Sequence, residues 1–101
     1  MTEQRHVRIE YRVRDDINLD QLAASIGEFV AGMRAHDQAT DYTSYRDAKD
    51  PRHFVHVGHF RPDAAASLQT QPFFQSFTAK LRESCASGPD VTNLTPVAST
   101  R

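Results

Sequence analysis

The sequence predicts an α+β domain in which an antiparallel sheet carries helices on one of its faces. Residues 6–14 and 53–60 alternate as strands do, with successive side chains on opposite faces. After residue 18, and again after residue 72, apolar residues recur every three or four positions, as they do on the buried face of a helix. The resulting order, β-α-β-β-α-β, is that of a ferredoxin-like sandwich.

The first strand and the first helix have the clearest patterns. In the strand, one face is apolar and the other is charged or carries histidine; the apolar face consists of Val7, Ile9, Tyr11 and Val13. Asn18 is expected to cap a helix of about 16–18 residues, because its side chain accepts a hydrogen bond from a first-turn N–H. The buried stripe of this helix is Leu19, Leu22, Ile26, Phe29, Val30 and Met33.

The second half begins with a weaker strand at residues 40–47 and a turn at Asp50-Pro51, which leads into the strong strand at residues 53–60. Pro62 is suited to the first position of a short helix, which Pro72 then breaks.

Pro72 also begins a further helix, whose apolar stripe is Phe73, Phe74, Phe77, Leu81 and Cys85. We expect Gly88-Pro89 to end this helix and residues 91–97 to form the last strand. One domain is expected over residues 1–101, with an ordered core at about 5–97 and a tail at 98–101.

Composition excludes several function classes. The chain has 101 residues, 12 Lys and Arg against 13 Asp and Glu, and a net charge of −1, so no basic surface for nucleic acid is expected. No apolar run is long enough to span or enter a membrane. The single cysteine, Cys85, has no partner for an internal disulfide, which favours a cytoplasmic location.

The strand at residues 53–60 predicts a partner chain. Neither of its faces is charged: one holds His53, Val55, Val57 and His59, and the other holds Phe54, His56, Gly58 and Phe60. Helices on one side of a sheet cover only one face. We therefore predict a symmetric homodimer in which two sheets meet face to face.

The segment from Tyr45 to Phe77 resembles the antibiotic biosynthesis monooxygenase (ABM) domain family. The resemblance rests on Tyr45-Arg46-Asp47, Asp50-Pro51, Phe54-Val55, Phe60-Arg61-Pro62-Asp63, Ala65, Gln71-Pro72-Phe73-Phe74 and Phe77. It implies a dimeric α/β barrel with an apolar pocket between sheet and helices, and some relatives oxygenate phenols or quinols without metal or flavin. This chain has Gly58, Phe60, Leu68 and Phe73 where the family often has Glu, Trp, His and His.

The candidate catalytic residues are His56, Tyr11 and Tyr42. Cofactor-free oxygenation needs a phenol or enol deprotonated in a dry pocket, and a histidine with a pKa near neutrality is suited to be the base. Either tyrosine would donate a hydrogen bond to the developing oxyanion. Gly58 is expected to leave a gap beside His56. The expected substrate-binding residues are Phe54, Gly58, Phe60, Phe74, Phe77 and Phe29.

A metal or haem centre is not expected. His53 and His59 share a strand face but lie about 20 Å apart at roughly 3.3 Å per residue, and His56 points the other way. Haem bound as in some relatives would need a histidine from the second helical region, but none follows His59.

The favoured hypothesis is thus a cofactor-independent monooxygenase-like homodimer acting on a small aromatic or quinol-type molecule. Two alternatives stay open. One is a non-catalytic ligand-binding or structural dimer, which the apolar replacements favour. The other is an isomerase-like enzyme that transfers a proton through His56.

Overall fold

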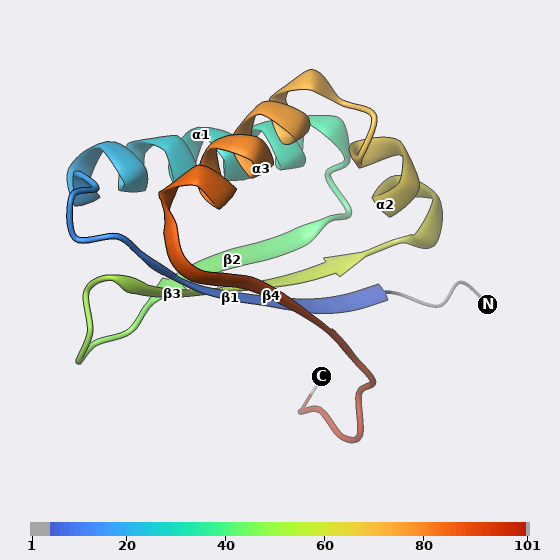
Figure 1. The fold of residues 1–101 in the computed structure, drawn as a ribbon. Coiled ribbons are helices and arrows are strands. Elements are labelled where there is room, and N and C mark those ends of the chain that lie inside the picture. Colours follow the sequence, from blue (N-terminus) through green and yellow to red (C-terminus); the bar gives the residue numbers. More distant parts are fainter. Residues whose placement is uncertain (1–4, 101) are drawn as a thin grey trace.

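The computed structural model describes residues 5–100, which form one four-stranded sheet with three helices on one face (Figure 1). All strand pairs are antiparallel, in the order β2-β3-β1-β4. The predicted ferredoxin-like α+β fold is confirmed. Its elements are β1 (Arg5–Val13), α1 (Leu19–His36), β2 (Asp41–Arg46), β3 (His53–Phe60), α2 (Pro62–Leu68), α3 (Pro72–Ser84) and β4 (Cys85–Leu94).

The helix starts follow the expected local chemistry. The Asn18 side chain accepts a 3.0 Å hydrogen bond from the Gln21 N–H, which caps α1 as predicted. Proline occupies the first turn of both α2 and α3, where its missing N–H costs no helical hydrogen bond. None of the helices within residues 5–100 combines the length and apolar character that crossing a bilayer requires.

The predicted end of α3 is wrong. The helix ends at Ser84, and β4 runs over Cys85–Leu94 instead of residues 91–97. Gly88 lies inside this strand with φ of +83°, and a Cβ there would be 2.7 Å from the Glu10 carbonyl oxygen. The pairing of β4 with β1 shifts register beside this point, so glycine here forms a bulge in a strand and does not terminate a helix.

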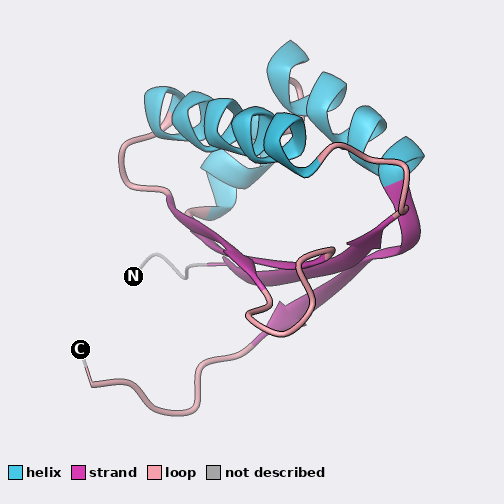
Figure 2. Ribbon diagram, turned by 90° about the vertical axis from the view of Figure 1, so that its left-hand side faces the viewer, coloured by secondary structure: helices cyan, strands magenta, loops and turns pink. Residues whose placement is uncertain are grey.

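The register brings one face of the central strands into the core. Along β3, the face toward the helices is the buried one, formed by Phe54, His56, Gly58 and Phe60. The stripe of α1 packs on this face through Leu22, Ile26, Phe29 and Met33. The opposite face, with Val55 and Val57, has no helix over it (Figure 2).

Gly58 does not leave a gap beside His56. A Cβ at this position would lie 2.5 Å from a Phe60 ring carbon and 2.8 Å from a Tyr42 ring carbon. The two rings therefore cover the glycine, and it permits their close approach to the sheet.

Replacing Gly58 by Ala should destabilise the protein, because the Phe60 and Tyr42 rings must move to admit a methyl group. We expect a loss of about 1–3 kcal/mol in the free energy of unfolding, measured by urea denaturation. Gly27→Ala is the matched control, since a Cβ there meets nothing within 4 Å and alanine favours the helix. A Gly58→Ala variant as stable as the wild type would contradict this packing.

Candidate functional site

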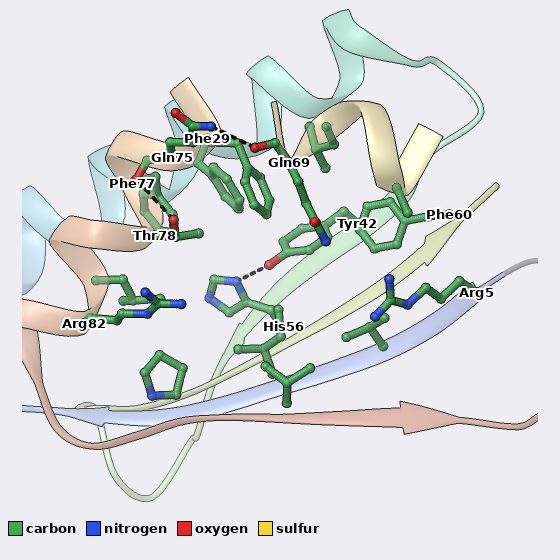
Figure 3. Close-up of a pocket in the computed structure, with 18 residues that line it drawn as sticks. Arg5, Phe29, Tyr42, His56, Phe60, Gln69, Gln75, Phe77, Thr78 and Arg82 are labelled. Atoms are coloured by element: carbon green, nitrogen blue, oxygen red, sulfur yellow. Dashed lines mark hydrogen bonds between the residues drawn. The ribbon is translucent and has the colours of Figure 1, made fainter. Parts of the chain in front are cut away.

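A cavity of about 500 Å³ lies between the sheet and the helices (Figure 3). Its wall is mainly apolar, formed by Val7, Ile9, Phe29, Phe60, Ala65, Leu68, Phe74, Phe77, Leu81, Pro89 and Val91. Its polar groups are Arg5, Tyr42, His56, Gln69, Gln75, Thr78 and Arg82. A mainly apolar cavity with a few polar groups is typical of a site for a small organic molecule.

His56 sits at this cavity between two tyrosines. Its Nδ1 lies 2.6 Å from the Tyr42 hydroxyl, and its Nε2 lies 2.8 Å from the Tyr11 hydroxyl. The His56 side chain is buried, with 1% of the residue exposed, and Tyr11 is 2% exposed. The three candidate catalytic residues therefore form one hydrogen-bonded chain, in which Tyr42 and His56 line the cavity and Tyr11 lies behind them.

The hydrogen bonds assign the protons in this chain. A neutral imidazole has one N–H and one accepting nitrogen, so one tyrosine donates to the ring and the other accepts from it. The Tyr11 hydroxyl has no other partner among the described residues and is enclosed by apolar side chains. Tyr11 must therefore donate to Nε2, and the Nδ1–H donates to the Tyr42 oxygen. The Tyr42 hydroxyl proton is then available to a molecule in the cavity.

Burial changes the acidity of all three groups. It lowers the pKa of His56 from 6.5 to about 4, because the charged imidazolium is poorly solvated there. Burial also raises the pKa of Tyr11 and of Tyr42 well above the ordinary value. The expected near-neutral pKa of His56 is therefore wrong, and the side chains of Tyr42, His56 and Tyr11 are all uncharged at neutral pH.

Aromatic rings form much of the cavity wall around His56. Phe29 of α1 stacks on Phe77 of α3, with ring centroids 4.1 Å apart and an interplanar angle of 14°. Phe74 lies beside Phe29 at 5.6 Å, and Phe60 lies beside Tyr42 at 6.1 Å. These four phenylalanines, expected from the sequence to bind a substrate, all line the cavity.

Two other expected substrate-binding residues do not line the cavity. Phe54 stacks on Tyr11 with ring centroids 5.5 Å apart, and the Arg46 guanidinium lies 5.4 Å from the centre of the Phe54 ring. Phe54 therefore belongs to the core. Gly58 is covered by the rings of Phe60 and Tyr42. Both residues share the inner face of β3 with His56, but neighbouring rings separate them from the open space.

Sequence reasoning missed the polar groups at the cavity edge. Thr78 and Arg82 follow Phe74 on α3 at intervals of four, which places all three on one side of the helix. This spacing was a usable signal. Gln75 lies near the same edge, where its amide Nε2 donates to the Gln69 carbonyl at 3.0 Å.

The other histidines of β3 lie on the outer face of the sheet. His53 is hydrogen-bonded to Glu10 at 2.7 Å and to Asp47 at 3.0 Å, and His59 contacts the His6 ring at 4.4 Å between centroids. Within residues 5–100, no group of three or more His, Cys, Asp or Glu side chains is arranged to hold a metal ion.

No protein-family model and no curated protein matches this sequence, but solved structures match its fold. Rv0793 from Mycobacterium tuberculosis has a TM-score of 0.82 and 21% identity, covering 98% of this chain and 100% of that one. A structure described as antibiotic biosynthesis monooxygenase has a TM-score of 0.79 and 19% identity, covering 93% and 99%. The chain has the antibiotic biosynthesis monooxygenase fold.

The ABM fold is also that of a variant of SnoaB, a cofactor-independent oxygenase from Streptomyces nogalater. SnoaB has a TM-score of 0.80 and 14% identity, covering 96% of each chain. The resemblance found in the segment from Tyr45 to Phe77 is thus confirmed at the level of the fold. At these identities the similarity carries the architecture, and chemistry has to be argued from the cavity itself.

The burial of neutral His56 should make stability depend on pH. Between pH 6.5 and about 4, the unfolded protein binds a proton at His56 that the folded protein does not, so stability is lost as the pH falls through this range. From pH 7 to 4.5 we expect the wild type to lose about 2.5 kcal/mol more than His56→Gln, which has no titrating group there.

Urea unfolding at the two pH values, at equal protein concentration, measures this difference. The surface carboxylates titrate equally in both proteins and cancel in the comparison. Identical pH dependence of the wild type and His56→Gln would show that His56 is not held neutral by burial.

Proposed function

We propose that the protein oxygenates a small planar hydroxyaromatic or quinol-type molecule with dioxygen and without a cofactor, in the cavity beside Tyr42. The observation that carries this proposal is the Tyr42–His56–Tyr11 chain, which directs one tyrosine hydroxyl toward a mainly apolar space. The ABM fold, shared with a cofactor-independent oxygenase, supports the same kind of reaction.

The substrate itself supplies the electrons in this reaction. Loss of the hydroxyl proton gives an anion, which passes one electron to dioxygen and forms a radical and superoxide. These two combine to a peroxide anion at a ring carbon that carries hydrogen, and the proton lost earlier returns to give a hydroperoxide. Loss of water from this hydroperoxide leaves a carbonyl group, so one oxygen atom enters the product and the other leaves as water.

Tyr42 is the residue proposed to contact the substrate. Its hydroxyl donates a hydrogen bond to the substrate oxygen, which stabilises the anion more than the neutral molecule. His56 and Tyr11 act as positioning residues. Tyr11 donates to Nε2 and so keeps the imidazole proton on Nδ1, and the Nδ1–H fixes the Tyr42 oxygen. With a pKa of about 4, His56 is a weak base, so the donor role expected for Tyr42 is better supported than the base role expected for His56.

A non-catalytic ligand-binding protein is the second candidate. The observation in its favour is that the two tyrosines occupy both nitrogens of His56, which leaves the imidazole no nitrogen for a substrate. The three side chains would then only orient a bound ligand. An isomerase-like enzyme would need His56 to accept a proton from the substrate, which the low pKa disfavours.

Oxygen consumption separates the three functions. A panel of anthrones, naphthols and hydroquinones should contain a compound whose oxidation the protein accelerates, with one atom of ¹⁸O₂ in the product by mass spectrometry. Binding without oxygen uptake would support the ligand-binding protein. Exchange of substrate hydrogen with deuterated water under nitrogen would support the isomerase.

Tyr42→Phe should lower kcat/KM for oxygen consumption by about 10²–10³-fold, because it removes the hydrogen bond to the substrate anion. Tyr45→Phe is the matched control: Tyr45 is on the same strand, is 54% exposed and does not line the cavity. In the wild type, the pH midpoint of kcat/KM should follow the hydroxyl pKa of each substrate. An unchanged rate in Tyr42→Phe would remove Tyr42 from the reaction.

We also propose that two copies of the chain pair through the outer face of the sheet. Val55 and Val57 lie at the centre of this face, partly exposed, and Tyr45 of the adjoining strand is 54% exposed. All three helices lie on the other side (Figures 1 and 2). A second copy would bury these apolar groups against their own equivalents, as a two-fold axis requires.

Val57→Asp should therefore give a monomer, because it puts an unpaired charge at the centre of the paired sheets. Ala24→Asp adds the same charge on the exposed surface of α1 and should leave the dimer intact. Light scattering coupled to size-exclusion chromatography measures both masses. A monomeric wild type at micromolar concentration would contradict the dimer.

A further inference from the structure

The charged groups at the cavity are all of one sign. Arg5 and Arg82 line it, while no Asp or Glu is among the 18 lining residues. Over the whole sequence, by contrast, acidic residues slightly outnumber basic ones. Because Tyr42 and His56 are uncharged at neutral pH, the guanidinium groups set the sign of the electrostatic potential in the cavity.

Arg82 is available to a ligand. It lies in the last turn of α3, and Figure 3 shows its guanidinium directed toward the space beside His56. Its side chain makes no hydrogen bond or ion pair with any other residue that the structure describes. By contrast, Arg14 and Arg61 are each paired with an aspartate at 3.0 Å.

Arg5 has a different position. Its guanidinium is at the other end of the cavity in Figure 3 and donates a long, 3.4 Å hydrogen bond to the Asn93 side chain. We therefore assign to Arg82 the main contact with a ligand anion and to Arg5 the same sign of charge at a greater distance from His56.

We propose that the cavity selects hydroxyaromatic compounds that carry a carboxylate, with the hydroxyl at Tyr42 and the carboxylate at Arg82. Guanidinium and carboxylate form two parallel hydrogen bonds, which fixes orientation as well as adding affinity. The phenylalanine wall would contact the ring between these two polar ends. This inference rests on the proposed binding of hydroxyaromatic molecules and adds the acidic group that Arg82 recognises.

Two fluorescent probes that differ by one carboxylate test the proposal. We expect 6-hydroxy-2-naphthoate to bind the wild type about tenfold more tightly than 2-naphthol at pH 7.5, measured by titration calorimetry. Arg82→Gln should remove this preference, with the affinity for 6-hydroxy-2-naphthoate falling to about that for 2-naphthol. The preference in the wild type should shrink as salt is added, because the site opens to solvent.

Arg34→Gln is the matched control, because it removes the same charge from an exposed position on α1 outside the cavity. It should retain the preference, and Arg82→Lys should retain part of it. Circular dichroism and the urea midpoint check that each variant is folded.

Three results would overturn the proposal, and they are distinguishable. Equal affinity of the wild type for both probes, or a preference that survives in Arg82→Gln, would refute carboxylate selection while the binding of 2-naphthol still supported the proposed function. If neither probe binds, the proposed binding of hydroxyaromatic molecules fails together with the selection.

Discussion

A histidine buried in an apolar layer requires a partner for each ring nitrogen, and this requirement organises the site. His56 pairs across the sheet with Ile9 on one side and Ser44 on the other. Tyr11 and Tyr42 lie two residues away from these partners, on the same face, where a long side chain reaches diagonally across a strand. Strands β1, β2 and β3 must therefore be in register for these hydrogen bonds to form. The polar groups of Tyr42 and His56 at the cavity are thus a consequence of the strand register.

The sheet also separates two chemical environments. On its outer face, charges are paired, as between Arg8 and Glu10 at 3.1 Å and between His53 and the same glutamate at 2.7 Å. On its inner face, the titratable groups are held neutral by burial. Such exposed pairs contribute little to stability. Among the residues that line the cavity, by contrast, no carboxylate balances the two guanidinium groups.

Periodicity predicted the elements far better than the contacts between them. The strand at residues 53–60 and the cap at Asn18 were predicted correctly, because each depends only on residues close to it in the sequence. The end of α3 was misplaced, since Gly88 serves a bulge that depends on the neighbouring strand. Period two placed Tyr11 on an apolar strand face and His56 on an uncharged one, but only the structure shows that both faces meet the helices and that the two side chains touch. Arg82 was missed because an exposed arginine near a helix end usually faces only solvent.

In the proposed reaction, the depressed pKa of His56 decides between two ways of forming a substrate anion. Transfer of a proton from a phenol of pKa near 10 to an imidazole of pKa about 4 is unfavourable by about 8 kcal/mol, before any stabilisation of the product. The hydrogen bond from Tyr42 instead favours binding of a substrate already ionised at its hydroxyl, with the proton released to water, while Arg82 holds the carboxylate. The ionised fraction of the substrate rises as its reactive hydroxyl becomes more acidic. The geometry therefore favours substrates whose hydroxyl ionises readily, and it makes the histidine a fixed support for Tyr42.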